Sequence, residues 1–354
     1  MQTITRRCRC VTSRRKPAVV EAADGHRRLT SEDVARAAGV SASAVSRAFT
    51  PGASVSPEKR ARIVRAASEL GYRPNVMARA VATQRSNVIG LILFSETNRH
   101  HPEVLLALSR AFSALGLRIM LFLIEEDEEI GGVVDHILSY RLDGVIAAAT
   151  IPAEHRAQFD RARVPLLFYN RSDQADTSSV SCNHHASGEM IARHLMAGGH
   201  RSFALIRADL DSLVGRERMR GVEDALAGTG GVVAADFRGD FDYDHGVAAV
   251  RHWADRGIVD FTAIIAANDM MAIGAKDALV QQGRRVPEEV AVAGFDGIEA
   301  GRWLSYRIPS VGQPIEAMAQ AAAEMMTRRI AGRTAIAEQR LFPGLLQTGF
   351  ADAP

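Results

Sequence analysis

The hydrophobic and polar positions of the 354-residue chain follow two patterns, and the change comes near residue 87. Beyond it, short continuous apolar runs alternate with segments long enough for helices. Runs of this kind are typical of strands buried on both faces of a parallel sheet. The seven expected strands are Val88–Phe94, Arg118–Ile124, Asp143–Ala149, Pro165–Tyr169, Ser202–Arg207, Thr262–Asn268 and Val290–Asp296.

This alternation predicts a doubly wound α/β fold. The stretch is long enough for two lobes of that type, and ligands bind such sheets at the carboxyl ends of the strands. We therefore expect a two-lobed core with a ligand cleft.

Residues 29–73 show the shorter pattern of small amphipathic helices. Thr30 can cap a first helix that Asp33 closes from the third position, and Gly39 ends it. Ser41 caps a second short helix, so the two predict a helix-turn-helix. The apolar face is expected to comprise Val34, Ala35, Ala38, Val45, Ala48 and Phe49. The small residues expected to let the helices cross closely are Ala37, Ala38 and Ala44.

A third helix is predicted at Pro57–Leu70, capped by Ser56 and ended by Gly71. Its residues expected in the core are Ile63, Val64, Ala67 and Leu70. Its charged face is suited to contact with phosphates, because the surrounding segment is strongly basic.

The net charge of +2 conceals an uneven distribution. Residues 1–85 carry 17 Lys and Arg against 6 Asp and Glu, whereas the rest carries 26 against 35. A basic head on an acidic body indicates a polyanionic partner for the head alone. We expect residues 1–28 to be a disordered basic tail or an over-long start, with a nucleic-acid-binding arm as the alternative.

The cysteines are Cys8, Cys10 and Cys182, which leaves no disulfide framework and no four-ligand zinc set. The arginines near the start precede no apolar segment of a secretion signal, and no apolar run approaches the ~18 residues of a membrane span. We expect a cytoplasmic protein.

Three motifs in order, DVARAAGVSASAVSRAF, VSPEKRARIVRAASELGYRPNVMAR and RSNVIGLIL, resemble the amino-terminal signature of the LacI/GalR family of bacterial transcription regulators. The resemblance runs with few gaps from Leu29 to about Gln313. It implies a helix-turn-helix DNA-binding domain at 29–73, a hinge helix and linker at 74–86, and a two-lobed, periplasmic-binding-protein-like domain at 87–354 for effector binding and dimerisation. We place the crossovers between the lobes near Asn170, Gly297 and Arg328.

In this family the second helix reads the major groove, and the matching positions are Ala42, Ser43 and Arg47. Arg47 can pair with a guanine edge, a contact worth about 1–3 kcal/mol of discrimination. The DNA-contacting residues that the resemblance implies are Thr30, Ala42, Ser43, Ser46, Arg47, Ser56, Asn75, Ala78 and Val81. One reading helix with one arginine gives little specificity, so we expect a homodimer on a pseudo-palindromic double-stranded operator.

The linker 74–86 is too short for a helix that is stable alone in water. The resemblance implies that it becomes helical over the operator, where Val81 would enter the minor groove as a wedge.

The resemblance also implies a small polar effector, often a sugar, with an aromatic ring stacked on it. The implied effector-binding residues are Ser95, Asn98, Asn170, Arg216, Arg218, Phe241, Asn268, Asp296 and Gln313. We expect Arg218 and Asp296 to hold the effector from different sides of the cleft. Because paired arginines suit a carboxylate or phosphate, a sugar acid is as compatible with this pattern as a neutral sugar.

Two stretches depart from the family pattern. NRHHPE (98–103) stands where relatives commonly show Asn-Pro and an aromatic pair, and Asn183 and His184 replace a frequent Asp-Asn. The four histidines His100, His101, His184 and His185 raise the alternative of a metal sensor. No helical i, i+4 pair or thiol set supports it, so we expect surface or pocket-polar histidines, no metal and no cofactor.

The main alternative is a sugar-modifying α/β enzyme or kinase fused to a DNA-binding module. The chain lacks a dinucleotide loop, a GK[ST] phosphate loop and a G-x-S-x-G elbow. A binding protein for transport conflicts with the absent export signal and the basic head. We therefore expect a ligand-controlled transcriptional regulator that is not an enzyme, a repressor by family habit, with an activator as the alternative.

Overall fold

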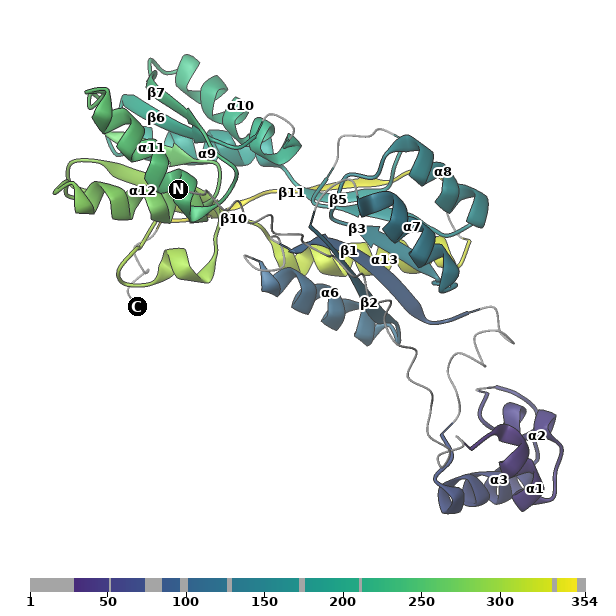
Figure 1. Cartoon of the computed structure of the whole chain (residues 1–354). Coiled ribbons are helices and arrows are strands. Elements are labelled where there is room, and N and C mark those ends of the chain that lie inside the picture. The colour runs from purple at the N-terminus through teal and green to yellow at the C-terminus, as the bar shows by residue number, and fades with distance from the viewer. Residues whose placement is uncertain are drawn as a thin grey trace, which may run out of the picture. The chain divides into compact units, whose positions relative to one another are not determined.

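The computed structural model describes residues 29–50, 52–73, 85–95, 101–125, 129–171, 176–209, 212–332 and 336–348. The chain divides into two compact units, Met1–Ala82 and Thr83–Pro354, called the head and the core below. The boundary between them falls within the segment 74–86 expected to be a linker. Figure 1 shows both units, with labels on many of their helices and strands.

The described residues of the head form the helices α1 (Ser31–Ala38), α2 (Ala42–Ala48) and α3 (Pro57–Leu70). Thr30 begins α1, because its backbone N–H and its hydroxyl both donate to the Asp33 carboxylate at 2.9 Å. Gly39 ends α1 in the left-handed region, with φ +62°. The Ser41 hydroxyl accepts from the Ala44 N–H and begins α2. The predicted helix-turn-helix is confirmed.

The apolar interior of the head is small. Its buried residues are Val34, Ala35, Ala38, Val45, Ala48, Ile63, Ala66 and Ala67. The predictions for Ala37, Val64 and Leu70 are wrong, because all three are exposed. Val64 lies one position after the buried Ile63 and therefore points to another side of α3, and Leu70, the last residue of α3, is 38% exposed.

The first lobe of the core is a six-stranded sheet in the order β11-β5-β4-β3-β1-β2, with every neighbouring pair parallel. Its strands are β1 (Val88–Phe94), β2 (Arg118–Ile124), β3 (Gly144–Ala147), β4 (Leu166–Tyr169), β5 (Ser179–Cys182) and β11 (Gln339–Phe342). Helices α6 (Pro102–Ala114) and α13 (Ile315–Ile330) share one apolar cluster with the sheet, and α7 (Ile130–Ser139) and α8 (Ala153–Ala162) share another. The sheet is therefore covered on both faces.

The second lobe is a six-stranded sheet in the order β12-β10-β9-β8-β6-β7, parallel except for β12. Its strands are β6 (Ser202–Arg207), β7 (Val232–Arg238), β8 (Ala263–Ala266), β9 (Ala291–Asp296), β10 (Ser310–Gly312) and β12 (Leu345–Gln347). Its helices are α9 (His184–Ala197), α10 (Leu213–Ala227), α11 (Tyr243–Asp255), α12 (Asp269–Gln281) and the 3-10 helix η2 (Glu299–Arg302). The predicted two-lobed α/β core is confirmed.

The chain passes between the lobes at three places within the described residues. It crosses from β5 to α9 at Asn183, from β10 to α13 at residues 313–314, and from β11 to β12 at residues 343–344. The crossover positions expected near Asn170, Gly297 and Arg328 are wrong.

The physical reason lies in two short strands with little apolar signal. After Asn170 the chain still adds β5 to the first sheet, and after Gly297 it adds β10 to the second. Arg328 lies inside α13.

Glycine pairs bring the helices of the second lobe into backbone contact. A Cβ on Gly188 of α9 would overlap the Arg218 carbonyl oxygen and lie 2.9 Å from the Val222 nitrogen. A Cβ on Gly221 of α10 would overlap the His185 carbonyl oxygen. The two helices can approach this closely only because both positions lack a side chain. This contact sets the position of Arg218, on α10, relative to α9.

The core fixes its own amino-terminal end through Asp143. The Ser86 backbone N–H and hydroxyl donate to Asp143 Oδ1 at 2.8 and 3.0 Å, and the Asn87 N–H donates to Oδ2 at 2.9 Å. Ser86 is 4% exposed. These bonds hold the chain at the point where it enters β1.

Candidate functional site

A cavity of about 170 Å³ lies where the carboxyl ends of strands from both lobes meet. Pockets for drug-sized ligands usually measure roughly 300–1,000 Å³, so this one suits a smaller molecule. The first lobe contributes His101, Val104, Ala148, Tyr169, Asn170 and Arg171. The second lobe contributes Ser212, Val214, Arg218, Phe241, Asn268 and Asp296, and Gln313 comes from the crossover after β10.

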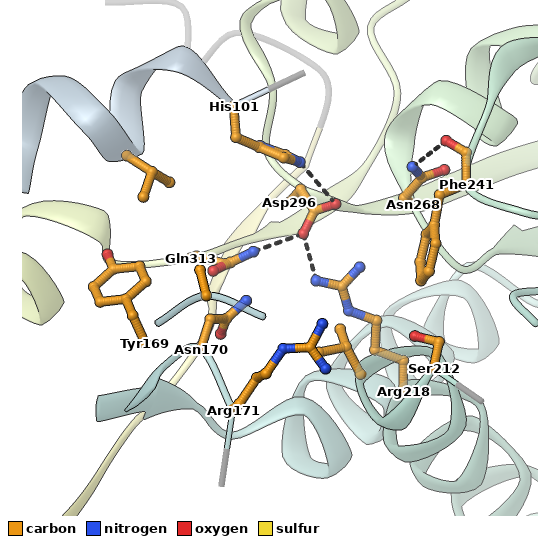
Figure 2. Close-up of a pocket in the computed structure, with 13 residues that line it drawn as sticks. His101, Tyr169, Asn170, Arg171, Ser212, Arg218, Phe241, Asn268, Asp296 and Gln313 are labelled. Atoms are coloured by element: carbon orange, nitrogen blue, oxygen red, sulfur yellow. Dashed lines mark hydrogen bonds and ion pairs between the residues drawn. The ribbon is translucent and has the colours of Figure 1, made fainter. Parts of the chain in front are cut away.

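The Asp296 carboxylate is the common acceptor of this cavity (Figure 2). Its Oδ1 accepts from an Arg218 guanidinium nitrogen and from Gln313 Nε2, the latter at 2.8 Å. Its Oδ2 lies 3.4 Å from His101 Nε2. Asp296 thus receives donors from the first lobe, the second lobe and a crossover.

Burial raises the pKa of Asp296, but the charges of Arg218 and His101 and their hydrogen bonds outweigh it and hold the pKa well below its usual value. Burial also disfavours the charged form of His101 and so lowers its pKa. The charge and hydrogen bond of Asp296, together with Glu103, reverse this effect and raise the His101 pKa to about 10. The cavity therefore contains a carboxylate and an imidazolium at neutral pH.

Arg218 is 2% exposed and is held on both sides. Its second guanidinium nitrogen donates to the Ala267 carbonyl oxygen at 2.7 Å, and its guanidinium carbon lies 5.0 Å from the centre of the Phe295 ring. Arg218 and Asp296 both belong to the second lobe. The expectation that they hold an effector from different sides of the cleft is therefore wrong.

Three residues of the cavity have a backbone conformation that residues other than glycine seldom adopt. Asn170, Phe241 and Asp296 have φ angles of +57°, +59° and +97°. Such conformations cost on the order of 1–3 kcal/mol and are concentrated at ligand-binding positions. The strained backbone therefore places these three residues in the lining of the cavity.

Two asparagines support the cavity walls. Asn268 begins α12, because its Oδ1 accepts from the Met271 N–H at 2.9 Å, and its amide nitrogen donates to the Phe241 carbonyl oxygen at 2.6 Å. Asn170 Oδ1 lies 3.0 Å from His184 Nε2. Burial and the charge of Arg218 lower the His184 pKa to about 3, so this ring is neutral and donates.

Six of the expected effector-binding residues line the cavity: Asn170, Arg218, Phe241, Asn268, Asp296 and Gln313. Ser95, directly after β1, does not line it, and Asn98 lies outside the described residues. Arg216 is exposed on α10, because residues two positions apart on a helix point in widely different directions. The structure therefore does not bring Arg216 to the cavity.

The implied effector-binding set lacked several lining residues: His101, which was expected only as a surface or pocket-polar histidine, and Val104, Ala148, Tyr169, Arg171, Ser212 and Val214. His101 stands in the motif that departs from the family pattern, and Arg171 directly follows Asn170. Both were accessible from the sequence as polar residues near strand ends. The apolar members carry no such signal.

The histidines of the described residues lie apart. His101 pairs with Asp296, His184 contacts Asn170, and His185 pairs at 2.8 Å with Asp224 of α10. His100 lies outside the described residues. Within the described part of the chain, no group of three or more His, Cys, Asp or Glu could hold a metal ion.

The second helix of the head presents a polar face. Ser43, Ser46 and Arg47 are exposed, and Arg47 Nε donates to the Ser43 carbonyl oxygen at 3.3 Å. Ala42, which the resemblance places among the groove-reading positions, is half-buried and packs against the apolar residues of the head. Thr30 caps α1.

Ser56 begins α3 by accepting from the Lys59 N–H. The Arg60 guanidinium fastens α3 to the turn after α2, donating to the carbonyl oxygens of Ala48 and Ala53. Asn75, Ala78 and Val81 lie outside the described residues. No helix in the described part of the chain is long and apolar enough to cross a membrane.

Comparison with known proteins covers both units. A model described as "Bacterial regulatory proteins, lacI family" matches residues 30–75, and a "Periplasmic binding protein-like domain" matches residues 192–349. The HTH-type transcriptional regulator CelR of Thermobifida fusca is 34% identical over 87% of this chain and 94% of its own length. The ribose operon repressor of Escherichia coli K12 is 28% identical over 91% of this chain and 99% of its own length.

Solved structures also match most of the chain. The lac repressor dimer bound to operator and the anti-inducer ONPF covers 92% of this chain and 100% of its own, at 27% identity and a TM-score of 0.83. The CelR–cellobiose complex covers 90% and 98%, at 30% identity and a TM-score of 0.69.

Proposed function

The chain belongs to the lacI family of bacterial regulatory proteins, and from this premise we propose that its head binds operator DNA while the cavity of its core binds a small polar effector. Effector binding changes operator affinity. The observation that carries the proposal is the Asp296 network, which gathers donors from both lobes around one cavity.

The DNA-binding part rests on α2. Its exposed Arg47 is the side chain that can read a guanine edge, while Ser43 and Ser46 can reach phosphates or bases. The basic composition of residues 1–85 supplies affinity that does not depend on sequence. We assign Thr30 and Ser56 to phosphate contacts near the helix starts, and Asn75, Ala78 and Val81 to the centre of the operator.

Repression by a homodimer is the form of regulation we propose. The relatives compared include repressors, and one solved relative is a dimer on its operator. A pseudo-palindromic operator would match the symmetry of such a dimer. The cytoplasm, where bacterial DNA lies, is the compartment in which the protein acts.

The chain uses its cavity for binding and not for catalysis. The relatives are transcriptional regulators. Arg218 and His101 hold Asp296 strongly ionised, so this carboxylate is a weak general base. Incubation of the protein with ATP and candidate sugars should leave both unchanged in amount.

The decisive experiment first selects the operator duplex and then measures whether a ligand changes the affinity of the protein for it. Duplexes chosen by the protein from a random library should contain a two-fold-related sequence. A gel shift with that duplex, titrated with sugars and sugar acids including cellobiose, should show one class of ligand that changes operator affinity. Selection of no common sequence would contradict the DNA-binding half of the proposal, and operator binding insensitive to every polar ligand would contradict the effector half.

A further inference from the structure

The buried charges around the cavity do not balance. Three charged side chains that line it are nearly withdrawn from water: Arg218 is 2% exposed, Asp296 6% and His101 14%. Two of them are cations and one is an anion. Isolated charge inside a protein is costly unless it is paired, so an excess cation here is a place for an anionic partner.

His101 is a cation because of where both of its ring nitrogens point. Nε2 lies 3.4 Å from Asp296 Oδ2, and Nδ1 lies 3.3 Å from Glu103 Oε1. Burial lowers the His101 pKa, yet these two carboxylates raise it to about 10. Glu103 does not line the cavity, and its side chain is 41% exposed, so water screens its charge.

The remaining ionisable groups near the cavity do not restore the balance. Burial keeps His184 neutral, with a pKa of about 3, and raises the pKa values of Tyr169 and Cys182, which keeps both uncharged. Burial and the charge of Asp296 raise the pKa of Asp269 to about 7, and that carboxyl does not line the cavity. Arg171 adds a further guanidinium to the lining, where it also donates to the Thr150 hydroxyl at 3.0 Å.

Arg218 also carries one buried nitrogen without a partner in the described part of the chain. One terminal nitrogen is bonded to Asp296 and the other to Ala267, but its buried Nε has no hydrogen-bond partner among the described residues. Buried donors without partners are rare in proteins and are commonly satisfied by a bound group. In Figure 2 the guanidinium of Arg171 lies on the same side of the cavity as that of Arg218.

We propose that the effector is a small polyhydroxylated acid, whose anionic group contacts His101 from the first lobe and Arg218 from the second. This inference rests on the proposed function and narrows the effector from polar molecules in general to anionic ones. The anion balances the excess positive charge, and its hydroxyls donate to Asp296. Since the two cations belong to different lobes, an anion between them also draws the lobes together.

The test compares acids with neutral molecules of the same shape. The full chain is titrated with D-glucuronate, D-galacturonate and D-gluconate, and with the amide of each, while its melting temperature is recorded. We expect an acid that raises the melting temperature and an amide of the same sugar that binds at least about tenfold more weakly. Equal affinity of acid and amide would overturn the inference, as would a panel in which no acid binds.

The variant His101→Gln separates charge from shape, because glutamine keeps a donor and loses the positive charge. It should weaken binding of the acid at least about tenfold more than binding of the amide. The matched control is His136→Gln, at an exposed position on α7 away from the cavity. Equal weakening of acid and amide by His101→Gln would also overturn the inference.

The outcomes distinguish this inference from the function on which it rests. Cellobiose or another neutral sugar that changes operator affinity, with no acid doing so, would overturn the anionic effector and leave the regulator intact. Operator affinity that responds to neither class would count against both.

Discussion

A single carboxylate links three parts of the core. Asp296 accepts from Arg218 of α10, from Gln313 of a crossover, and faces His101 of the first lobe. Removing a buried charged partner leaves the others without compensation, which costs more than the lost bond itself. The Asp296 site is therefore a structural joint, at the position where we propose that the effector binds.

Arg47→Ala should abolish the preference of the protein for its operator over random DNA. Binding that depends on salt and not on sequence should persist, because it comes from the other basic residues. Competition gel shifts measure the ratio of the two affinities. Arg36→Ala is the matched control, since it removes an exposed arginine of α1 and should weaken both kinds of binding alike. An unchanged ratio in Arg47→Ala would remove Arg47 from base reading.

The pKa of His101 predicts how stability changes with pH. The folded protein holds this proton up to about pH 10, whereas an unfolded histidine releases it near 6.5. The stabilising contribution is complete below pH 6.5 and is lost as pH rises through 10, so the free energy of unfolding should fall across this range. Urea denaturation between pH 6 and 10 measures it. The wild-type curve should converge on that of His101→Gln, and parallel curves would contradict the assignment.

At the site, sequence similarity located the polar residues that follow strands, such as Asn170 and Asp296. It could not distinguish Arg216 from Arg218, since both stand in one motif and only the burial of α10 separates them. It also could not reveal that Asp296 is paired with Arg218. That contact depends on how α10 and β9 pack, which no local pattern encodes.

At the scale of elements, the strands with long apolar runs were predictable and those without them were not. The expected runs at β1, β6 and β9 are apolar because these strands are packed on both faces. The edge strand β2 was also predicted, because its run RIMLFLI is apolar although its residues are mostly half-buried. β7 is an edge strand with mostly exposed residues, and β5 reads SVSC, with little apolar signal despite its burial. β10, β11 and β12 have three or four residues each. These omissions displaced the expected crossovers.

Gly188→Ala should separate α9 from α10 and move Arg218. The added methyl group would overlap the Arg218 carbonyl oxygen, and overpacking of this kind costs about 1–3 kcal/mol. Effector affinity should fall together with the free energy of unfolding.

Gly132→Ala on α7 is the control for this substitution, because nothing lies within 4 Å of a Cβ at that position. It should stabilise the protein by roughly 0.5–1 kcal/mol through helix propensity. Denaturation and ligand titration of both variants provide the measurement, and equal effects of the two alanines would contradict the role of the glycine contact.

At the scale of the whole molecule, deletion of the basic tail tests whether non-specific DNA affinity and operator choice come from different segments of the chain. Residues 1–28 lie outside the described residues and carry eight Lys and Arg against two Asp and Glu. Because α1 begins at its own cap, Thr30, deletion of this tail should leave the choice of operator unchanged. Non-specific affinity should fall, with a shallower dependence on salt. Selection of a different operator by the truncated protein would identify the tail as an arm that reads DNA.

The Asp143 anchor has a consequence for engineering. The core secures Ser86 and Asn87 through its own carboxylate, without any residue of the head. A fusion junction placed before Arg85 would leave that anchor whole, so the core could serve as an interchangeable sensor attached to a foreign DNA-reading module. Such a hybrid should bind the operator of the foreign DNA-reading module, with an affinity that changes with the effector of this protein. The substitution Asp143→Ala should abolish that change in operator affinity.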